Sequence, residues 1–315
     1  MKTRVITSAV GLVVLFAVMA LFDTFVFNVV IAAICLLAIH EVFKAFRFEK
    51  AAYIYWGFVP YTLLVMFSDF HMVRICMLPA SYIFALYLVL CVIGNSKSIN
   101  YAKLGGMVLF SCIIMFCFYS LIYLKQLLPR ATYGYDALYF IFLILGFAWG
   151  GDSAAYFAGR AFGKHKLAPV VSPKKTVEGA VGGVVGGAVL VLIAAVIMNR
   201  TLDLAMPLWS AVVLGAVGAV LGEIGDLSFS VIKRQTGIKD YGHIFPGHGG
   251  VLDRFDSVLF VAPFAVFLRV CKVKFVRFLY VLENVKRQIV QAVYDGEAVL
   301  LRKSPFACHH KRVLD

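Results

Sequence analysis

Acidic, basic and glycine residues gather in one short stretch of the chain, residues 239–257, with the sequence KDYGHIFPGHGGVLDRFDS. Within this stretch Asp253 and Asp256 are three positions apart, so a helix would place both carboxylates on one face. A third acid, Asp226, lies upstream where an apolar segment turns polar. Carboxylate oxygens and substrate phosphates are the ligands that Mg²⁺ prefers. The three acids therefore predict a site for Mg²⁺ and a polyphosphate.

Two further features surround these acids. Upstream, Glu223, Asp226, Ser230 and Lys233 recur every three or four positions, which predicts one polar stripe along a helix. Just before Asp253, a glycine-rich turn follows residue 245. Glycines in such a turn expose backbone N–H groups and allow a phosphate to approach the main chain.

A second polar region covers residues 151–183. Ser172 and Pro173 have the residue types of an N-cap and a first helical position. Lys174 and Lys175 would then occupy the first turn of a helix, where the helix dipole already favours anions. Two lysines there weaken the helix and improve a phosphate site, so we expect them to bind phosphate.

The rest of the chain is strongly apolar. Of the 315 residues, 62% are hydrophobic and only 15% are charged. In soluble domains about a quarter of the residues are charged. Apolar segments of roughly the length needed to cross a bilayer recur along the chain. Their expected ranges are 5–22, 24–40, 53–68, 75–93, 104–124, 136–151, 174–198, 207–226 and 255–271. We therefore predict an all-α, polytopic integral membrane protein with about nine transmembrane helices.

The distribution of Lys and Arg predicts the orientation in the membrane. With the N-terminus in the cytoplasm, sixteen basic residues fall in inner loops and four in outer loops. Both long polar loops, expected at 152–173 and 227–254, then face the cytoplasm. Residues 1–271 form the predicted transmembrane catalytic domain. The basic, amphipathic tail at 272–315 would lie outside after nine spans, so either the span count is off by one or the tail is an exception.

Several features are interpreted as structural. The net charge of +13 comes without the aromatic-interleaved basic stripe of a nucleic-acid module, so we expect no nucleic-acid partner. Glycines spaced three or four apart within 179–187 and 215–225 predict close packing of helices. His40 and Glu41, at the inner end of the second segment, are interpreted as an interfacial pair, with a functional role as the alternative.

The run SVIKRQTGIKDYGHIFPGHGGVLDRFD, residues 230–256, resembles the signature of phosphatidate cytidylyltransferases, also called CDP-diacylglycerol synthases. Parts of the second polar region, with Asp152, AYFAGRAFGK and SPKKTVEG, are also similar to that family. The tail after residue 272 is longer than the family pattern. The resemblance implies the reaction of CTP with phosphatidate to give CDP-diacylglycerol and pyrophosphate, in a homodimer. A compact chain without a transit-type N-terminus leads us to expect a bacterial cytoplasmic membrane.

The resemblance also implies roles for individual residues. Asp226, Asp253 and Asp256 would bind Mg²⁺, with a second cation such as K⁺. Phosphates of CTP or of the lipid would contact Lys174, Lys175, Lys233, Arg234, Lys239 and Arg254. The alternative for Arg254 is that it only neutralises the aspartates beside it. The other expected substrate-binding residues are Asp152, Ser230, Asp240, His248, Gly249 and Gly250.

Two other functions remain as alternatives. A membrane lipid or polyprenol kinase would also use a nucleotide, Mg²⁺ and a lipid, although the chain has no GxxxxGK[ST] pattern. A transporter would also carry carboxylates in the membrane, but transporters usually show paired internal repeats, and no such repeat is visible in the sequence. The group transferred from the nucleotide discriminates between the enzymes.

Overall fold

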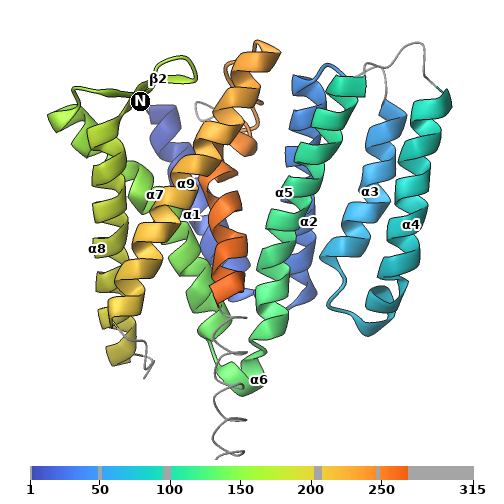
Figure 1. The fold of residues 1–315 in the computed structure, drawn as a ribbon. Coiled ribbons are helices and arrows are strands. Elements are labelled where there is room, and N and C mark those ends of the chain that lie inside the picture. The colour runs from blue at the N-terminus through green and yellow to red at the C-terminus, as the bar shows by residue number, and fades with distance from the viewer. Residues whose placement is uncertain (1, 49–51, 95–100, 202–207, 246–248, 269–315) are drawn as a thin grey trace, which may run out of the picture. The chain divides into compact units, whose positions relative to one another are not determined.

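A computed structural model describes residues 2–48, 52–94, 101–201, 208–245 and 249–268 (Figure 1). Residues Met1–Val266 form one compact unit. The predicted tail at 272–315 lies outside the described residues. The fold below is therefore that of the predicted catalytic domain.

Each of the nine expected apolar segments coincides with a helix. The helices are α1 (Lys2–Ala20), α2 (Phe25–Ala45), α3 (Ala52–Met66), α4 (His71–Gly94), α5 (Tyr101–Leu127), α6 (Arg130–Tyr133), α7 (Asp136–Phe162), α8 (Val177–Thr201) and α9 (Leu208–Thr236). A further helix covers residues 252–268. Among the described helices, only the short α6 has no counterpart among the expected segments.

Six of the described helices are long and apolar enough to cross a membrane: α2, α4, α5, α7, α8 and α9. The apolar parts of α1 and α3, Ala9–Ala20 and Ala52–Met66, are shorter than that length. The chain is therefore an all-α integral membrane protein, whereas the expected number of nine spans stays a prediction.

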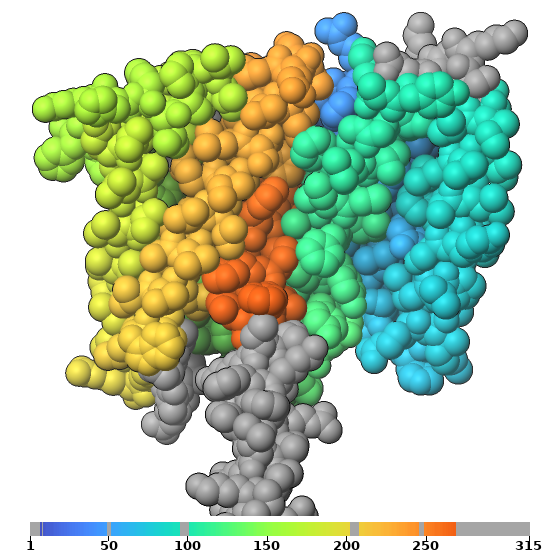
Figure 2. All heavy atoms as spheres, in the orientation of Figure 1, coloured from blue at the N-terminus to red at the C-terminus, as the bar shows by residue number. Residues whose placement is uncertain are grey.

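Helices α8 and α9 pack tightly against one another. The close contacts predicted from the glycine spacing are present: a Cβ atom on Gly215 of α9 would lie 2.7 Å from Ala188 Cα of α8. Small residues allow helix backbones to approach closely in a membrane. On the face shown in Figure 2, α9 and residues 252–268 lie beside α5, where the Phe118 and Phe255 rings are 5.9 Å apart.

The expected start of the seventh segment is wrong. Residues Ser172–Thr176 form a strand, β2, which pairs antiparallel with β1 (Lys166–Ala168), and α8 begins only at Val177. Thr176 Oγ1 accepts a hydrogen bond from the Gly179 N–H (3.1 Å), so Thr176 is the N-cap rather than Ser172. Lys174 and Lys175 therefore lie on a strand and not in a first helical turn.

The expected polar loop at 152–173 also begins later than predicted. Helix α7 continues to Phe162, so Asp152 lies inside this helix. Likewise α9 continues to Thr236, which places Ser230 and Lys233 on the same helix as Asp226, as the stripe predicted. Both helices continue beyond their apolar segments. A helix needs backbone hydrogen bonds and one packed face, and it does not need an apolar residue at every position.

Candidate active site

The candidate site is built where α7, β2, α9 and the start of the helix 252–268 meet. Lys175 on β2 joins the two polar regions of the sequence. Its Nζ atom lies 2.7 Å from Glu223 Oε1 and 2.5 Å from Asp226 Oδ2, both on α9. Burial lowers the pKa of Lys175, but the two carboxylates outweigh it and hold the pKa above its ordinary value. Lys175 is therefore a charged ammonium group within this site.

Asp226 and Asp256 meet at the centre of the site. The two carboxyl groups are close enough to interact electrostatically, and Asp256 is only 8% exposed. Ser230 Oγ donates to Asp226 Oδ1 (3.2 Å), and the Ser257 N–H donates to Asp256 Oδ1 (2.9 Å). Two carboxyl groups in such contact require a proton or a cation between them. This pair is the strongest structural indication of a cation site.

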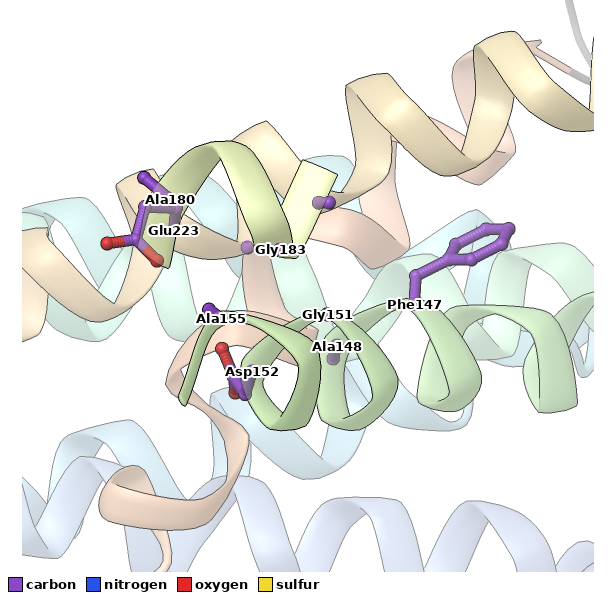
Figure 3. A pocket seen from close by; sticks show the side chains of 10 residues that line it. Phe147, Ala148, Gly151, Asp152, Ala155, Ala180, Gly183 and Glu223 are labelled. Carbon is purple, nitrogen blue, oxygen red and sulfur yellow. The ribbon is translucent and has the colours of Figure 1, made fainter. Parts of the chain in front are cut away.

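Asp152 extends the same cluster from α7. Ser257 Oγ donates a hydrogen bond to Asp152 Oδ2 (3.0 Å). Figure 3 shows Asp152 and Glu223 at a small cavity between α7, α8 and α9, lined also by Ala155, Ala180 and Gly183. The cavity of about 10 Å³ has room for about one water molecule. A ligand larger than a water molecule therefore does not fit inside this cavity.

Asp253 is engaged differently from Asp226 and Asp256. Its Oδ1 atom lies 2.9 Å from Lys233 Nζ, and Oδ2 accepts the backbone N–H groups of Tyr241 (2.8 Å) and Gly250 (3.0 Å). Oδ2 thus holds the loop residues Tyr241 and Gly250, whereas Oδ1 connects the helix 252–268 to α9. To bind a metal ion, as predicted, Asp253 would have to give up one of these contacts.

Tyr241 fixes the same loop to α9. Its hydroxyl donates to the Phe229 carbonyl (2.9 Å), and its ring lies 5.5 Å from Lys233 Nζ. Burial, followed by the charge of Asp253, raises the pKa of Tyr241, so the hydroxyl keeps its proton. Tyr241 therefore anchors the loop to α9 close to Lys233.

In the described part of the chain, no group of three or more His, Cys, Asp or Glu side chains forms a ready-made metal site. The reason is visible in the contacts: Lys175 lies between Glu223 and Asp226, and Lys233 is paired with Asp253. Apart from these ammonium groups, the side chains of Asp152, Ser230 and Ser257 around the Asp226–Asp256 pair present oxygens, the ligand type that Mg²⁺ prefers. The oxygens of this cluster therefore suit a hard cation, which would either replace the ammonium groups or bind beside them.

The remaining predicted residues lie around this cluster. Arg234 Nε donates to the Val171 carbonyl (3.0 Å) and so connects α9 to the β1–β2 turn. Gly249 has a φ of +90°, which glycine adopts without strain, and an added Cβ would lie 2.9 Å from Asp253 Oδ2. The exposed residues are Lys174, Arg234, Lys239, Asp240 and Arg254. His248 lies outside the described residues.

Glu41 and Ser257 are absent from the predicted site residues, although a functional role was the alternative for Glu41. Glu41 on α2 is 2% exposed, and its carboxylate accepts backbone N–H groups at the start of the helix 252–268. An acid within an apolar segment is costly and usually has a function, and this signal was available in the sequence. Ser257 gave no such signal, because a serine at a helix end has many uses.

The amino-acid sequence matches the cytidylyltransferase family over residues 2–271. It is 32% identical over 283 residues to the phosphatidate cytidylyltransferase of Bacillus subtilis, covering 85% of this chain and 97% of that protein. It is 42% identical over 152 residues to the enzyme of that name from Staphylococcus saprophyticus, covering 47% of this chain and 56% of that protein. With the Haemophilus influenzae protein of that name, the identity is 42% over 130 residues, covering 41% of this chain and 45% of that protein. The chain therefore belongs to the cytidylyltransferase family.

Proposed function

We propose that this protein is a phosphatidate cytidylyltransferase, which converts CTP and phosphatidate to CDP-diacylglycerol and pyrophosphate. The observation that carries this proposal is the 32% identity that extends over 97% of the Bacillus subtilis phosphatidate cytidylyltransferase. The contacts that join Asp152, Lys175, Asp226 and Asp256 support it, because they bring the two polar regions of the sequence into one site.

The proposed reaction needs no nucleophile from the protein. A phosphate oxygen of phosphatidate attacks the α-phosphorus of CTP, the bond from that phosphorus to the bridging oxygen breaks, and pyrophosphate leaves. Catalysis then depends on positioning the two phosphates and on neutralising their charge. Lys175 and Lys233 suit this role, since each is a buried or half-buried ammonium that can exchange a carboxylate for a phosphate.

We propose that Asp226 and Asp256 bind Mg²⁺, together with Asp253 if it releases one of its present contacts. Four acidic side chains, those of Asp152, Glu223, Asp226 and Asp256, outnumber the two ammonium groups that act on them, those of Lys175 and Lys233. When bound, Mg²⁺ would neutralise charge on the triphosphate. A second cation such as K⁺ is part of the same proposal.

The exposed basic residues are proposed to hold the outer phosphates. Lys174 lies on β2 of the hairpin, Arg234 near the end of α9, Lys239 in the segment after α9, and Arg254 beside Asp253. The alternative that Arg254 only neutralises the neighbouring aspartates stays open. Ser230 already donates to Asp226, so it orients this carboxylate.

The orientation and the assembly are further parts of the proposal. The bias of Lys and Arg toward the loops that carry the site supports an active site on the cytoplasmic side, with lipid entering from the bilayer. The bacterial relatives support a bacterial cytoplasmic membrane. The homodimer implied by the family resemblance is also proposed. Light scattering of the detergent-solubilised protein tests it through the protein mass.

The test uses CTP labelled in either the α-phosphate or the γ-phosphate. The purified full chain is incubated with phosphatidate and Mg²⁺, and the organic extract is counted. Cytidylyl transfer places the α-label in the lipid and leaves the γ-label in water. In a parallel incubation, a polyprenol or diacylglycerol replaces phosphatidate and γ-labelled ATP or CTP is supplied. Transfer of the γ-label to that lipid, with no α-label in phosphatidate, would establish the kinase instead.

A further inference from the structure

A buried carboxylate far from the signature in the sequence contacts it directly in space. Glu41 lies near the C-terminal end of α2, and its side chain is 2% exposed. An ionisable group buried in a membrane helix is costly unless it is fully hydrogen-bonded. The contacts of Glu41 therefore indicate what it does.

Both oxygens of Glu41 accept backbone hydrogen bonds at the start of the helix 252–268. Oε1 accepts the Val251 N–H (2.8 Å), and Oε2 accepts the Leu252 N–H (2.9 Å). The first N–H groups of a helix have no partner within the helix, and a negative charge there interacts favourably with the helix dipole. Glu41 thus caps this helix from another element of the fold.

The loop before the helix is shaped to admit this carboxylate. A Cβ atom added to Gly242 would lie 2.5 Å from Glu41 Oε1, and one added to Gly250 would lie 2.7 Å from Glu41 Cδ. Neither glycine has a positive φ, so backbone conformation does not require glycine at these positions. The space occupied by the Glu41 carboxylate does require it. Any larger residue at these positions would displace the carboxylate.

The capped segment directly precedes the acids of the candidate site. Asp253 accepts the Gly250 N–H, so carboxylates hold three consecutive N–H groups, those of residues 250–252. Asp256 follows Leu252 by about one helical turn and meets Asp226. The position of Asp256 therefore depends on where Glu41 fixes the start of the helix.

We propose that Glu41 is a positioning residue of the active site: it touches no substrate, but it fixes the start of the helix 252–268 and thereby the place of Asp256 opposite Asp226. This inference rests on the proposed cytidylyltransferase activity. It differs from a purely stabilising role, in which loss of Glu41 would lower the amount of folded protein without changing the turnover of each folded molecule.

The test compares Glu41→Gln with Asn28→Ala, a control on the same helix. Asn28 is also fully buried, and its side chain donates to the Met66 carbonyl (2.8 Å) at the other end of α2, about 20 Å away. Both variants lose buried hydrogen bonds, so both should melt at a lower temperature than the wild type. Only Glu41→Gln should lower kcat per folded molecule, by at least about tenfold, because one backbone contact and the charge are lost.

A second readout is independent of activity. Hydrogen exchange followed by mass spectrometry should show faster exchange of the Val251 and Leu252 amides in Glu41→Gln, by about tenfold or more, and no change in Asn28→Ala. Gly242→Ala should have the same effect as Glu41→Gln. In a Glu41→Ala background, Gly242→Ala should add little, because the group that it displaces is gone.

The outcomes separate the two proposals. A wild-type protein that transfers no cytidylyl group overturns the proposed function, while the exchange measurement still decides whether Glu41 holds the loop. If the wild type is active and Glu41→Gln keeps its kcat, or if the Val251 and Leu252 amides exchange at unchanged rates, the positioning role is wrong.

Discussion

Lys175→Met removes the ammonium group that joins β2 to α9 and keeps an unbranched side chain. In the structure this group lies 2.7 Å from Glu223 Oε1 and 2.5 Å from Asp226 Oδ2, and its side chain is 22% exposed. Removing one partner of a buried ion pair costs about 3–5 kcal/mol, because the other charge stays behind without compensation. Since solvent reaches part of Lys175, we expect the lower end, about 3 kcal/mol of unfolding free energy.

The assay is unfolding of the detergent-solubilised protein, with Arg130→Met as the matched control. Arg130 also forms an ion pair, with Asp23 at 2.9 Å, but the two side chains are 52% and 40% exposed. Exposed pairs contribute about 1 kcal/mol or less, so this control should change stability little. A double-mutant cycle of Lys175→Met with Glu223→Gln should give a coupling of about 1–3 kcal/mol.

The pH dependence of this effect has a defined sign. The pKa of Lys175 lies above its ordinary value of 10.5, because the carboxylates of Asp226 and Glu223 outweigh the effect of burial. The stabilisation is therefore fully present below about pH 10.5 and is lost as the pH rises through the pKa of the folded state. If Lys175→Met unfolds no more easily than Arg130→Met at neutral pH, the buried ion pair does not exist as described.

Two further predictions concern the elements that hold the site. Tyr241→Phe removes the hydroxyl that donates to the Phe229 carbonyl and should cost about 1–2 kcal/mol of unfolding free energy, measured by thermal unfolding; an unchanged melting temperature would contradict the contact. Thr176→Ala removes the N-cap of α8 and should cost about 1 kcal/mol, whereas Ser172→Ala should cost less; the reverse order would restore Ser172 as the cap.

The helical part of the site was predictable because its spacing is periodic. Asp226, Ser230 and Lys233 lie on one helix, as their spacing indicated. The spacing of small residues predicted the close approach of α8 and α9, confirmed at Gly215 and Ala188. In both cases the signal is local, since side chains three or four apart on a helix share a face.

The start of α8 could not be predicted in the same way. Ser172 and Thr176 are both suitable N-caps, and local sequence does not choose between them. The choice is made by pairing with β1, where Lys166 lies opposite Thr176 and Ala168 opposite Ser172. The contact of Glu41 with Val251 and Leu252 is likewise invisible in the sequence, because it joins residues more than two hundred positions apart.

Asp256→Asn tests the central proposal most directly, because it changes one oxygen of the Asp226–Asp256 pair and little else. The control is Asp136→Asn, the same change in the first turn of α7, about 24 Å along this helix from Asp152. Transfer of α-labelled CTP to phosphatidate should fall at least about 100-fold in Asp256→Asn and stay near the wild-type rate in the control, with both proteins folded. Equal transfer by the two variants would show that the carboxylate pair is not the catalytic site.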